Sequence, residues 1–480
     1  MLSLSPLKAF RFGILGILVL FWTGCSSVSL KELTEQYYEG NAKKAFELAQ
    51  QGIKNREIKN DKKSAGVDDL LWQIEAGLIG FNLQSPKALE LLEGAEERIK
   101  EIELQGLLSS LFENFGAMLV NDRLIPYRAY LYEGVMVSYY KALYSMHKGD
   151  YVNSRIELNR ASDRQRRIKN YYAEEILKSK EAQAKSLQSS ENTTQENSSH
   201  QAIQTQKILQ SYTNLSEFKN LNGYINPFID YVSGIFFYIQ GDKSKAQDFL
   251  KESYGISQTP MIADDLALLS KNEKKKYTWL LIEDGRGPSK ISREFSITLP
   301  IFTRDQILIM NASLALPDAI KGFSFAEDYT LTQNQSKITQ AQRIATLNPL
   351  FFNEFEKQLS FIVMRNVLSM ATKLALQAGL SQLGGIAGVL GNLGGLIYSR
   401  ASTAADLRMA SIIPNGFYAL RFENKEGIFE IEANGKKIGE LALTKSCDKL
   451  EQNKLCVSKH HMIYIRNAKH NIFRIHLISK

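Results

Sequence analysis

The chain has 480 residues and a formal net charge of +8, with 44% hydrophobic and 23% charged residues. This length and composition predict two or three globular domains with ample material for hydrophobic cores. Lysine and arginine are dispersed among acidic residues, a distribution that argues against a nucleic-acid-binding protein.

The chain begins with a segment organised like a secretory signal peptide. Lys8 and Arg11 precede an apolar run, Phe12 to Trp22, that is shorter than the about 20 residues needed to span a bilayer. Small residues then lead into Cys25, and this ending resembles a bacterial lipobox, in which the cysteine becomes N-terminal and diacylated after cleavage. Trp22 occupies the position where that pattern usually has leucine. We expect residues 1–24 to be removed and Cys25 to carry lipid; an ordinary signal peptide with an incidental cysteine is the alternative.

From Leu30 to about Lys180, apolar residues recur at helical spacing. A short unit appears three times, in which a glycine and an Asn or Asp are followed four residues later by Ala or Ser: Gly40-Asn41 with Ala45, Gly149-Asp150 with Ser154, and Gly241-Asp242 with Ala246. The glycine ends one helix in a left-handed turn, the polar residue caps the next, and the small residue permits close packing. This pattern predicts tetratricopeptide-like helical hairpins over residues 25–270.

Two further segments belong to this helical half. Ser85-Pro86 is placed to open the second helix of another hairpin. Residues 182–206 are rich in Ser, Gln, Asn and Thr and contain no aromatic residue, so we expect a disordered insertion there.

After residue 277 the pattern changes to alternating runs typical of strands. Asn434-Gly435 between two such runs predicts a β-hairpin. Leu374 to Tyr398 is an uncharged, glycine-rich stretch. Three interpretations remain for it: a buried packing helix, a membrane-contacting or oligomer-forming helix, and a true membrane span. The fold class expected is α+β, a helical solenoid followed by a smaller β-containing domain, 277–480, with this glycine-rich helix.

The two remaining cysteines, Cys447 and Cys456, lie close together near the C-terminus. An exported protein meets an oxidising compartment, so we predict a disulfide between them, with two free thiols as the alternative. A metal site with His460 and His461 has little support from two cysteines, and no metal or other cofactor is expected.

Several segments resemble a family of bacterial exported lipoproteins that have a tetratricopeptide-like N-terminal half. The matching residues are a Tyr-rich helix ending in Gly-Asp, an Arg-x-Glu helix, an Asn-Pro-Phe helix start and an Ala-Asp-x-Arg segment: Tyr139, Tyr140, Gly149, Asp150, Arg155, Glu157, Arg160, Ala161, Asn226, Pro227, Phe228, Ala405, Asp406 and Arg408. The resemblance implies an envelope lipoprotein with no assigned activity. Ser26 after the cysteine resembles Gram-negative lipoproteins of the outer membrane, which implies a lipid anchor there, facing the periplasm.

The sequence offers few catalytic candidates. We expect no catalytic residue: Glu283 and Asp284 precede a glycine turn, where carboxylates are usually solvated, although such a pair can act as acid and base. The histidines of the terminal β segment are expected at solvent-facing positions: His460, His461, His470 and His476.

The candidate binding residues are three arginines of one helix: Arg155, Arg160 and Arg164. We interpret them as a basic face that grips an acidic segment of an envelope protein, because guanidinium groups bind carboxylates in a bidentate way. The alternative is a solvated face with Glu–Arg pairs within the helix. The sequence thus predicts a membrane-anchored scaffold for protein–protein interactions in envelope assembly. A cell-wall-acting enzyme with a site between the helical and β parts is the alternative.

Overall fold

The computed structural model describes residues 28–57, 68–104, 126–188, 195–212, 224–271, 274–302, 307–381, 404–447 and 454–480. Cys25 and the predicted signal peptide lie outside these residues. Helices dominate the N-terminal half and strands the C-terminal half, so the predicted α+β class is confirmed.

The three hairpins predicted from the Gly-Asn and Gly-Asp turns are present. They are α2 (Leu30–Tyr38) with α3 (Ala42–Glu57), α7 (Leu131–His147) with α8 (Tyr151–Gln188), and α10 (Pro227–Gln240) with α11 (Lys243–Ser257). At the turns the φ angles of Gly40, Gly149 and Gly241 are +103°, +76° and +90°, the left-handed region that favours glycine. The Asp242 carboxylate then caps α11 by accepting the N–H of Lys245 at 3.3 Å.

The other N-terminal helices are α4 (Asp69–Asn82), α5 (Ala88–Leu104), α9 (Gln195–Gln210) and α12 (Pro260–Ser270). The α4–α5 pair is the hairpin predicted around Ser85-Pro86, and the Ser85 hydroxyl accepts the N–H of Lys87 at 3.3 Å.

The predicted disorder over 182–206 is wrong for its helical parts. Helix α8 continues to Gln188, and α9 begins at Gln195. Ile208 near the end of α9 and Tyr212 just after it, both C-terminal to this segment, are buried, and the Tyr212 hydroxyl donates to the Pro317 carbonyl at 2.9 Å. Tertiary packing at one end thus stabilises a helix whose own composition is poor in apolar residues.

Two five-stranded sheets form the C-terminal half. The first has the order β12-β11-β1-β7-β6: β12 (Asn471–Ser479), β11 (His461–Ala468), β1 (Tyr277–Asp284), β7 (Gly416–Glu423) and β6 (Gln342–Thr346). The second has the order β10-β9-β8-β4-β5: β10 (Lys454–Cys456), β9 (Lys436–Thr444), β8 (Gly427–Ala433), β4 (Tyr329–Gln333) and β5 (Ser336–Gln340). Asn434 and Gly435 have φ angles of +48° and +72° and form the predicted β8–β9 turn.

The first sheet lies between the helices and the second sheet. Along β1, Trp279 and Leu281 belong to the core shared with the helices, whereas Leu280 and Ile282 belong to the core shared with the second sheet. This alternation follows from the period of two in a strand. The described helices before residue 270 and the described strands after residue 277 therefore share a hydrophobic core.

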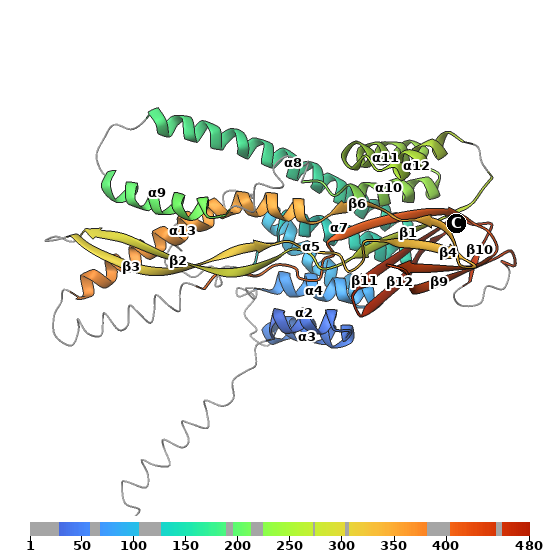
Figure 1. The fold of residues 1–480 in the computed structure, drawn as a ribbon, viewed down its shortest axis with the longest axis horizontal. Helices are drawn as coiled ribbons and strands as arrows, with labels where there is room; N and C mark the ends of the chain where they lie inside the picture. Colours follow the sequence, from blue (N-terminus) through green and yellow to red (C-terminus); the bar gives the residue numbers. More distant parts are fainter. Residues whose placement is uncertain are drawn as a thin grey trace, which may run out of the picture.

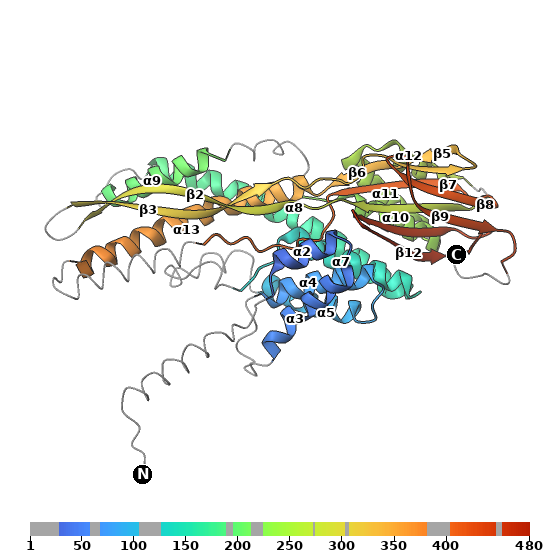
Figure 2. The same cartoon turned by 60° about the horizontal axis from the view of Figure 1, so that its bottom comes forward.

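A long two-stranded ribbon, β2 (Ser289–Phe302) and β3 (Ile307–Ile320), extends away from both sheets (Figures 1 and 2). Helices α9 and α13 (Asn348–Ser381) pack against it and against each other. The glycine-rich stretch 374–398 falls beyond the described residues from position 382 onward. Within the described part of the chain, no helix combines the length and apolar character that crossing a membrane requires.

Candidate functional site

The predicted basic face divides into one exposed arginine and two that are enclosed. Arg155 is 42% exposed; its guanidinium pairs with Asp242 at 3.1 Å and lies 4.8 Å from the centre of the Phe237 ring. Arg155 therefore links the second and third helical hairpins at the surface.

Arg164 is not available to a partner, which corrects the sequence prediction. Its side chain is 3% exposed and donates to Glu96 at 2.6 Å and to Glu103 at 3.0 Å. Arg160 is partly enclosed beside it and pairs with Glu157 at 2.5 Å. The acidic residues that bind Arg164 belong to helix α5 of the same chain, and the α7–α8 hairpin packs against this helix.

Glu283 and Asp284 are fully buried, so the expectation of solvated carboxylates is wrong. Both lie at the end of β1, the central strand of the first sheet, which places them between packed layers. The Glu283 carboxylate accepts the hydroxyls of Tyr140 at 2.5 Å and Tyr464 at 2.9 Å. Burial raises the pKa of Glu283, and these hydrogen bonds oppose the rise. This buried group joins α7 to β1 and β11.

Two of the four histidines also depart from the prediction of solvent-facing positions. His461 is fully buried, with Nε2 2.8 Å from the Cys456 carbonyl. His460 is half-buried and accepts the N–H of Tyr277 at 3.1 Å; burial lowers its pKa to about 4. His470 and His476 are exposed. Among the described residues, no three His, Cys, Asp or Glu side chains gather in a way that would hold a metal ion.

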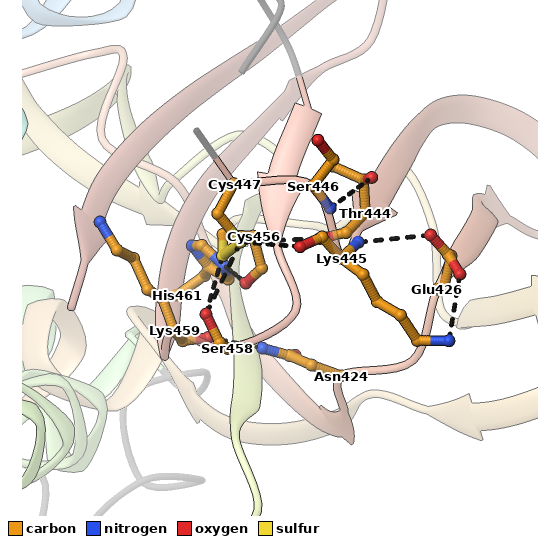
Figure 3. Close-up of a disulfide and its surroundings, with 10 residues drawn as sticks. All are labelled: Asn424, Glu426, Thr444, Lys445, Ser446, Cys447, Cys456, Ser458, Lys459 and His461. Atoms are coloured by element: carbon orange, nitrogen blue, oxygen red, sulfur yellow. Dashed lines mark hydrogen bonds and ion pairs between the residues drawn. A yellow bond between two sulfur atoms is a disulfide. The ribbon is translucent and has the colours of Figure 1, made fainter. Parts of the chain in front are cut away.

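Cys447 and Cys456 are joined by a disulfide, as predicted, with their Cα atoms 5.3 Å apart (Figure 3). The bond ties the segment after β9 to β10, which pairs with β9 in parallel. The Ser458 hydroxyl lies beside both sulfur atoms, at 3.6 and 3.0 Å. Because β10 is the edge strand of the second sheet, the disulfide fastens this edge strand beside the end of β9.

A segment that we call the strap, residues 404–415, crosses the helices without regular structure of its own. Two buried glutamates hold it: Glu75 on α4 accepts from Ser411, and Glu133 on α7 accepts the N–H of Ala410 at 2.8 Å. Arg408 of the strap pairs with Asp406 and with Asp68, each at 2.7 Å. The Asp-x-Arg motif seen in the sequence is therefore the part of the strap that fastens it to α4.

The strap forms one wall of a cavity of about 530 Å³. Its other walls are the starts of α2, α4 and β2 and the turn after β1. The lining residues are Val28, Ser29, Leu30, Lys31, Thr34, Asp68, Leu71, Trp72, Arg286, Pro288, Ser289, Lys290, Leu407, Arg408, Met409 and Ser411. Sequence analysis missed this cavity. The feature of the sequence that could have indicated an anion-binding cavity is Arg286, a basic residue between two glycines in a turn.

The ribbon is the second surface that sequence analysis did not single out. Its inner face is buried against the helices through Ile297, Leu299, Leu314 and Leu316. On the opposite face, near the tip, Ile307 and Ile309 are 59% and 67% exposed. The two exposed isoleucines lie two positions apart, on the same face of β3.

Comparison of the chain with protein-family models, with curated proteins and with solved structures finds no match. The function is therefore inferred from the residues and their geometry alone.

Proposed function

We propose that this protein is a lipid-anchored scaffold of the bacterial outer membrane that faces the periplasm and binds an envelope protein through the ribbon. The lipobox-like ending at Cys25 supports the anchor. The arginines of α8 pair mainly within the chain, so we assign the partner surface to β2 and β3 instead.

The observation that carries this proposal is the unpaired edge of β3. Among the described residues, β2 and β3 pair only with each other, over 14 residues each. From Ile307 to Pro317 the strand carries no charged residue. Natural proteins usually protect a long free edge with charges or bulges, since an exposed edge recruits another strand.

An extended protein segment is the partner chemistry that fits such an edge. Main-chain hydrogen bonds of an added strand supply affinity, and alternate side chains supply specificity. The exposed Ile307 and Ile309 alternate with half-buried residues, so an added strand would meet an aliphatic pair at the tip and the smaller Asn311 and Ser313 further along.

The alternative of a cell-wall-acting enzyme has less support. Its expected site lies between the helical and β parts, where Glu283 is the carboxylate that the sequence analysis considered as an acid or base. Tyr140 and Tyr464 occupy the space around this carboxylate.

Photo-crosslinking in intact envelopes tests the proposal. A photoreactive residue at Ser313 should trap one protein partner, and Ile309→Asp should abolish the trapped product. The control is Ile428→Asp on β8, which alters a similarly exposed isoleucine, 58% against 67%, on the second sheet. Products that contain only lipid or a second copy of this chain would overturn the proposal, as would equal yields from both variants.

A further inference from the structure

We propose that the cavity beside the strap binds the phosphate head and the first part of the tail of an anionic phospholipid. The cavity is independent of the ribbon, which carries the proposed scaffold function.

The charges that line the cavity favour an anion. Lys31, Arg286, Lys290 and Arg408 are basic, and Asp68 is the only acidic residue among the lining side chains. Asp68 is already engaged by Arg408 at 2.7 Å. Arg408 is also paired with Asp406 at 2.7 Å and Lys31 with Glu35 at 3.8 Å, so the attraction on an anionic group in this cavity comes mainly from Arg286.

Arg286 is the residue best placed to bind the phosphate. Among the described residues, its guanidinium makes no hydrogen bond or ion pair, and it lies 5.7 Å from the centre of the Tyr38 ring. The Gly-Arg-Gly turn is held rigidly, because the backbone of Arg286 pairs with that of Phe323 at 2.9 Å in both directions. A half-buried, stacked guanidinium with its donors unused is suited to bidentate binding of phosphate.

Two helix N-termini add to the positive potential. Helix α2 begins at Leu30 and α4 at Asp69, and residues of both first turns line the cavity. The free N–H groups at a helix start favour an anion.

The other lining residues fit an acyl chain. Leu71, Trp72 and Met409 are buried in the cavity wall, and Leu407 is 36% exposed at its rim. The volume of 530 Å³ lies within the about 300–1,000 Å³ of small-molecule sites. Basic groups beside apolar walls match a ligand that has both a charged head and an aliphatic tail.

The position of the cavity in the chain favours a membrane lipid over a free phosphate. Val28 lines the cavity, and Cys25 lies three residues earlier. Three extended residues reach at most about 11 Å, so a lipid on Cys25 would place the cavity at the membrane surface. The choice of a membrane lipid as the source of the phosphate rests on the proposed lipid anchor. The preference of the cavity for an anion does not depend on that anchor.

Binding is measured on the full-length protein, purified in a neutral detergent, by native mass spectrometry with dioctanoyl phosphatidic acid as the probe. One molecule should bind per chain, and Arg286→Gln should weaken its affinity at least about tenfold, the loss of one charge-assisted contact. The control Arg343→Gln, at an exposed position on β6, should leave the affinity unchanged.

Two further probes separate the head from the tail. Dioctanoylglycerol lacks the phosphate and should bind much more weakly, and inorganic phosphate lacks the tail and should do the same. Leu407→Gln should weaken phosphatidic acid binding and leave inorganic phosphate binding unchanged. Thermal unfolding shows whether each variant is folded.

Equal affinities for the unsubstituted protein and Arg286→Gln would overturn the proposal, as would tight binding of dioctanoylglycerol. Inorganic phosphate that binds as tightly as phosphatidic acid would refute the lipid as ligand. None of these measurements involves the ribbon, so a negative result here does not contradict the scaffold proposal. Likewise, a failed cross-link at Ser313 does not contradict the lipid-binding proposal.

Discussion

Glu75 on α4 and Ser411 of the strap, 336 positions apart in sequence, are joined by two hydrogen bonds. The backbone N–H and the hydroxyl of Ser411 both donate to one oxygen of Glu75, at 2.6 and 2.7 Å. The carboxylate is fully buried and lies near Glu133, which accepts the N–H of Ala410, the preceding residue of the strap. Both helices therefore position the strap, and the strap in turn closes the cavity.

Titration of Glu75 should make stability depend on pH. Burial raises its pKa from 4.5 to about 7, against the opposing effect of the Ser411 hydrogen bonds. Between these values the folded protein holds a proton that the unfolded chain has released, so the free energy of unfolding falls as pH rises. The shift corresponds to a contribution on the order of 3 kcal/mol.

Glu75→Gln keeps an acceptor for Ser411 and removes the titration. Denaturant unfolding at several pH values from about 4.5 to 8 should give a shallower slope for this variant, with Glu133 and Glu283 still contributing in both proteins. Parallel curves for the two proteins would show that Glu75 does not titrate in this range.

Two glycines with equally open surroundings should respond to alanine with opposite signs. An added Cβ meets no atom within 4 Å at Gly241 or at Gly255, but Gly241 has a φ angle of +90° and Gly255 lies inside α11. Gly241→Ala should lower the free energy of unfolding by about 1–2 kcal/mol. Gly255→Ala should raise it by up to about 1 kcal/mol. Chemical denaturation measures both, and a loss at Gly255 would contradict this account.

Arg164 and Arg155 should differ sharply in their contribution to stability. Arg164→Ala leaves Glu96 and Glu103 without their buried partner and should cost about 3 kcal/mol or more. Arg155→Ala removes a 42% exposed ion pair and should cost about 1 kcal/mol or less. Thermal unfolding of the two variants is the measurement; similar losses would place Arg164 in a solvated environment.

The disulfide should be detectable in the protein purified without reducing agent. Peptide mass spectrometry without reduction should find Cys447 and Cys456 linked, and two alkylatable thiols would refute the bond. Replacing both by serine should lower the free energy of unfolding by about 2–3 kcal/mol at most, because the closed loop is short.

Cys25→Ser should release the protein from the membrane fraction. Each buried CH₂ of an acyl chain contributes about 0.8 kcal/mol, so loss of the lipid removes a durable anchor. Cys447→Ser is the control, since it removes a cysteine far from the lipobox-like segment and should leave the protein membrane-bound. Fractionation followed by immunoblotting measures both. Retention of the Cys25→Ser protein would argue for a membrane contact other than the anchor.

The sequence by itself determined the local features. The left-handed turns at Gly40, Gly149 and Gly241, the hairpin at Asn434-Gly435 and the cysteine pair were all predicted. Each depends on residues within a few positions of one another, where backbone sterics and capping decide the conformation. The α+β class followed from the same local periodicities.

Only the tertiary structure decided what distant segments do to one another. The parallel pairing of β1 with β11 buries Glu283, and the packing of α7 against both α5 and α8 encloses Arg164. The strap closes a cavity around Arg286, whose neighbours in the cavity wall come from three other, distant parts of the chain. A local sequence pattern cannot predict these contacts, because a carboxylate or a guanidinium looks the same in the sequence whether folding leaves it in solvent or buries it in a core. Its burial, partners and charge state are set by the side chains that folding brings against it.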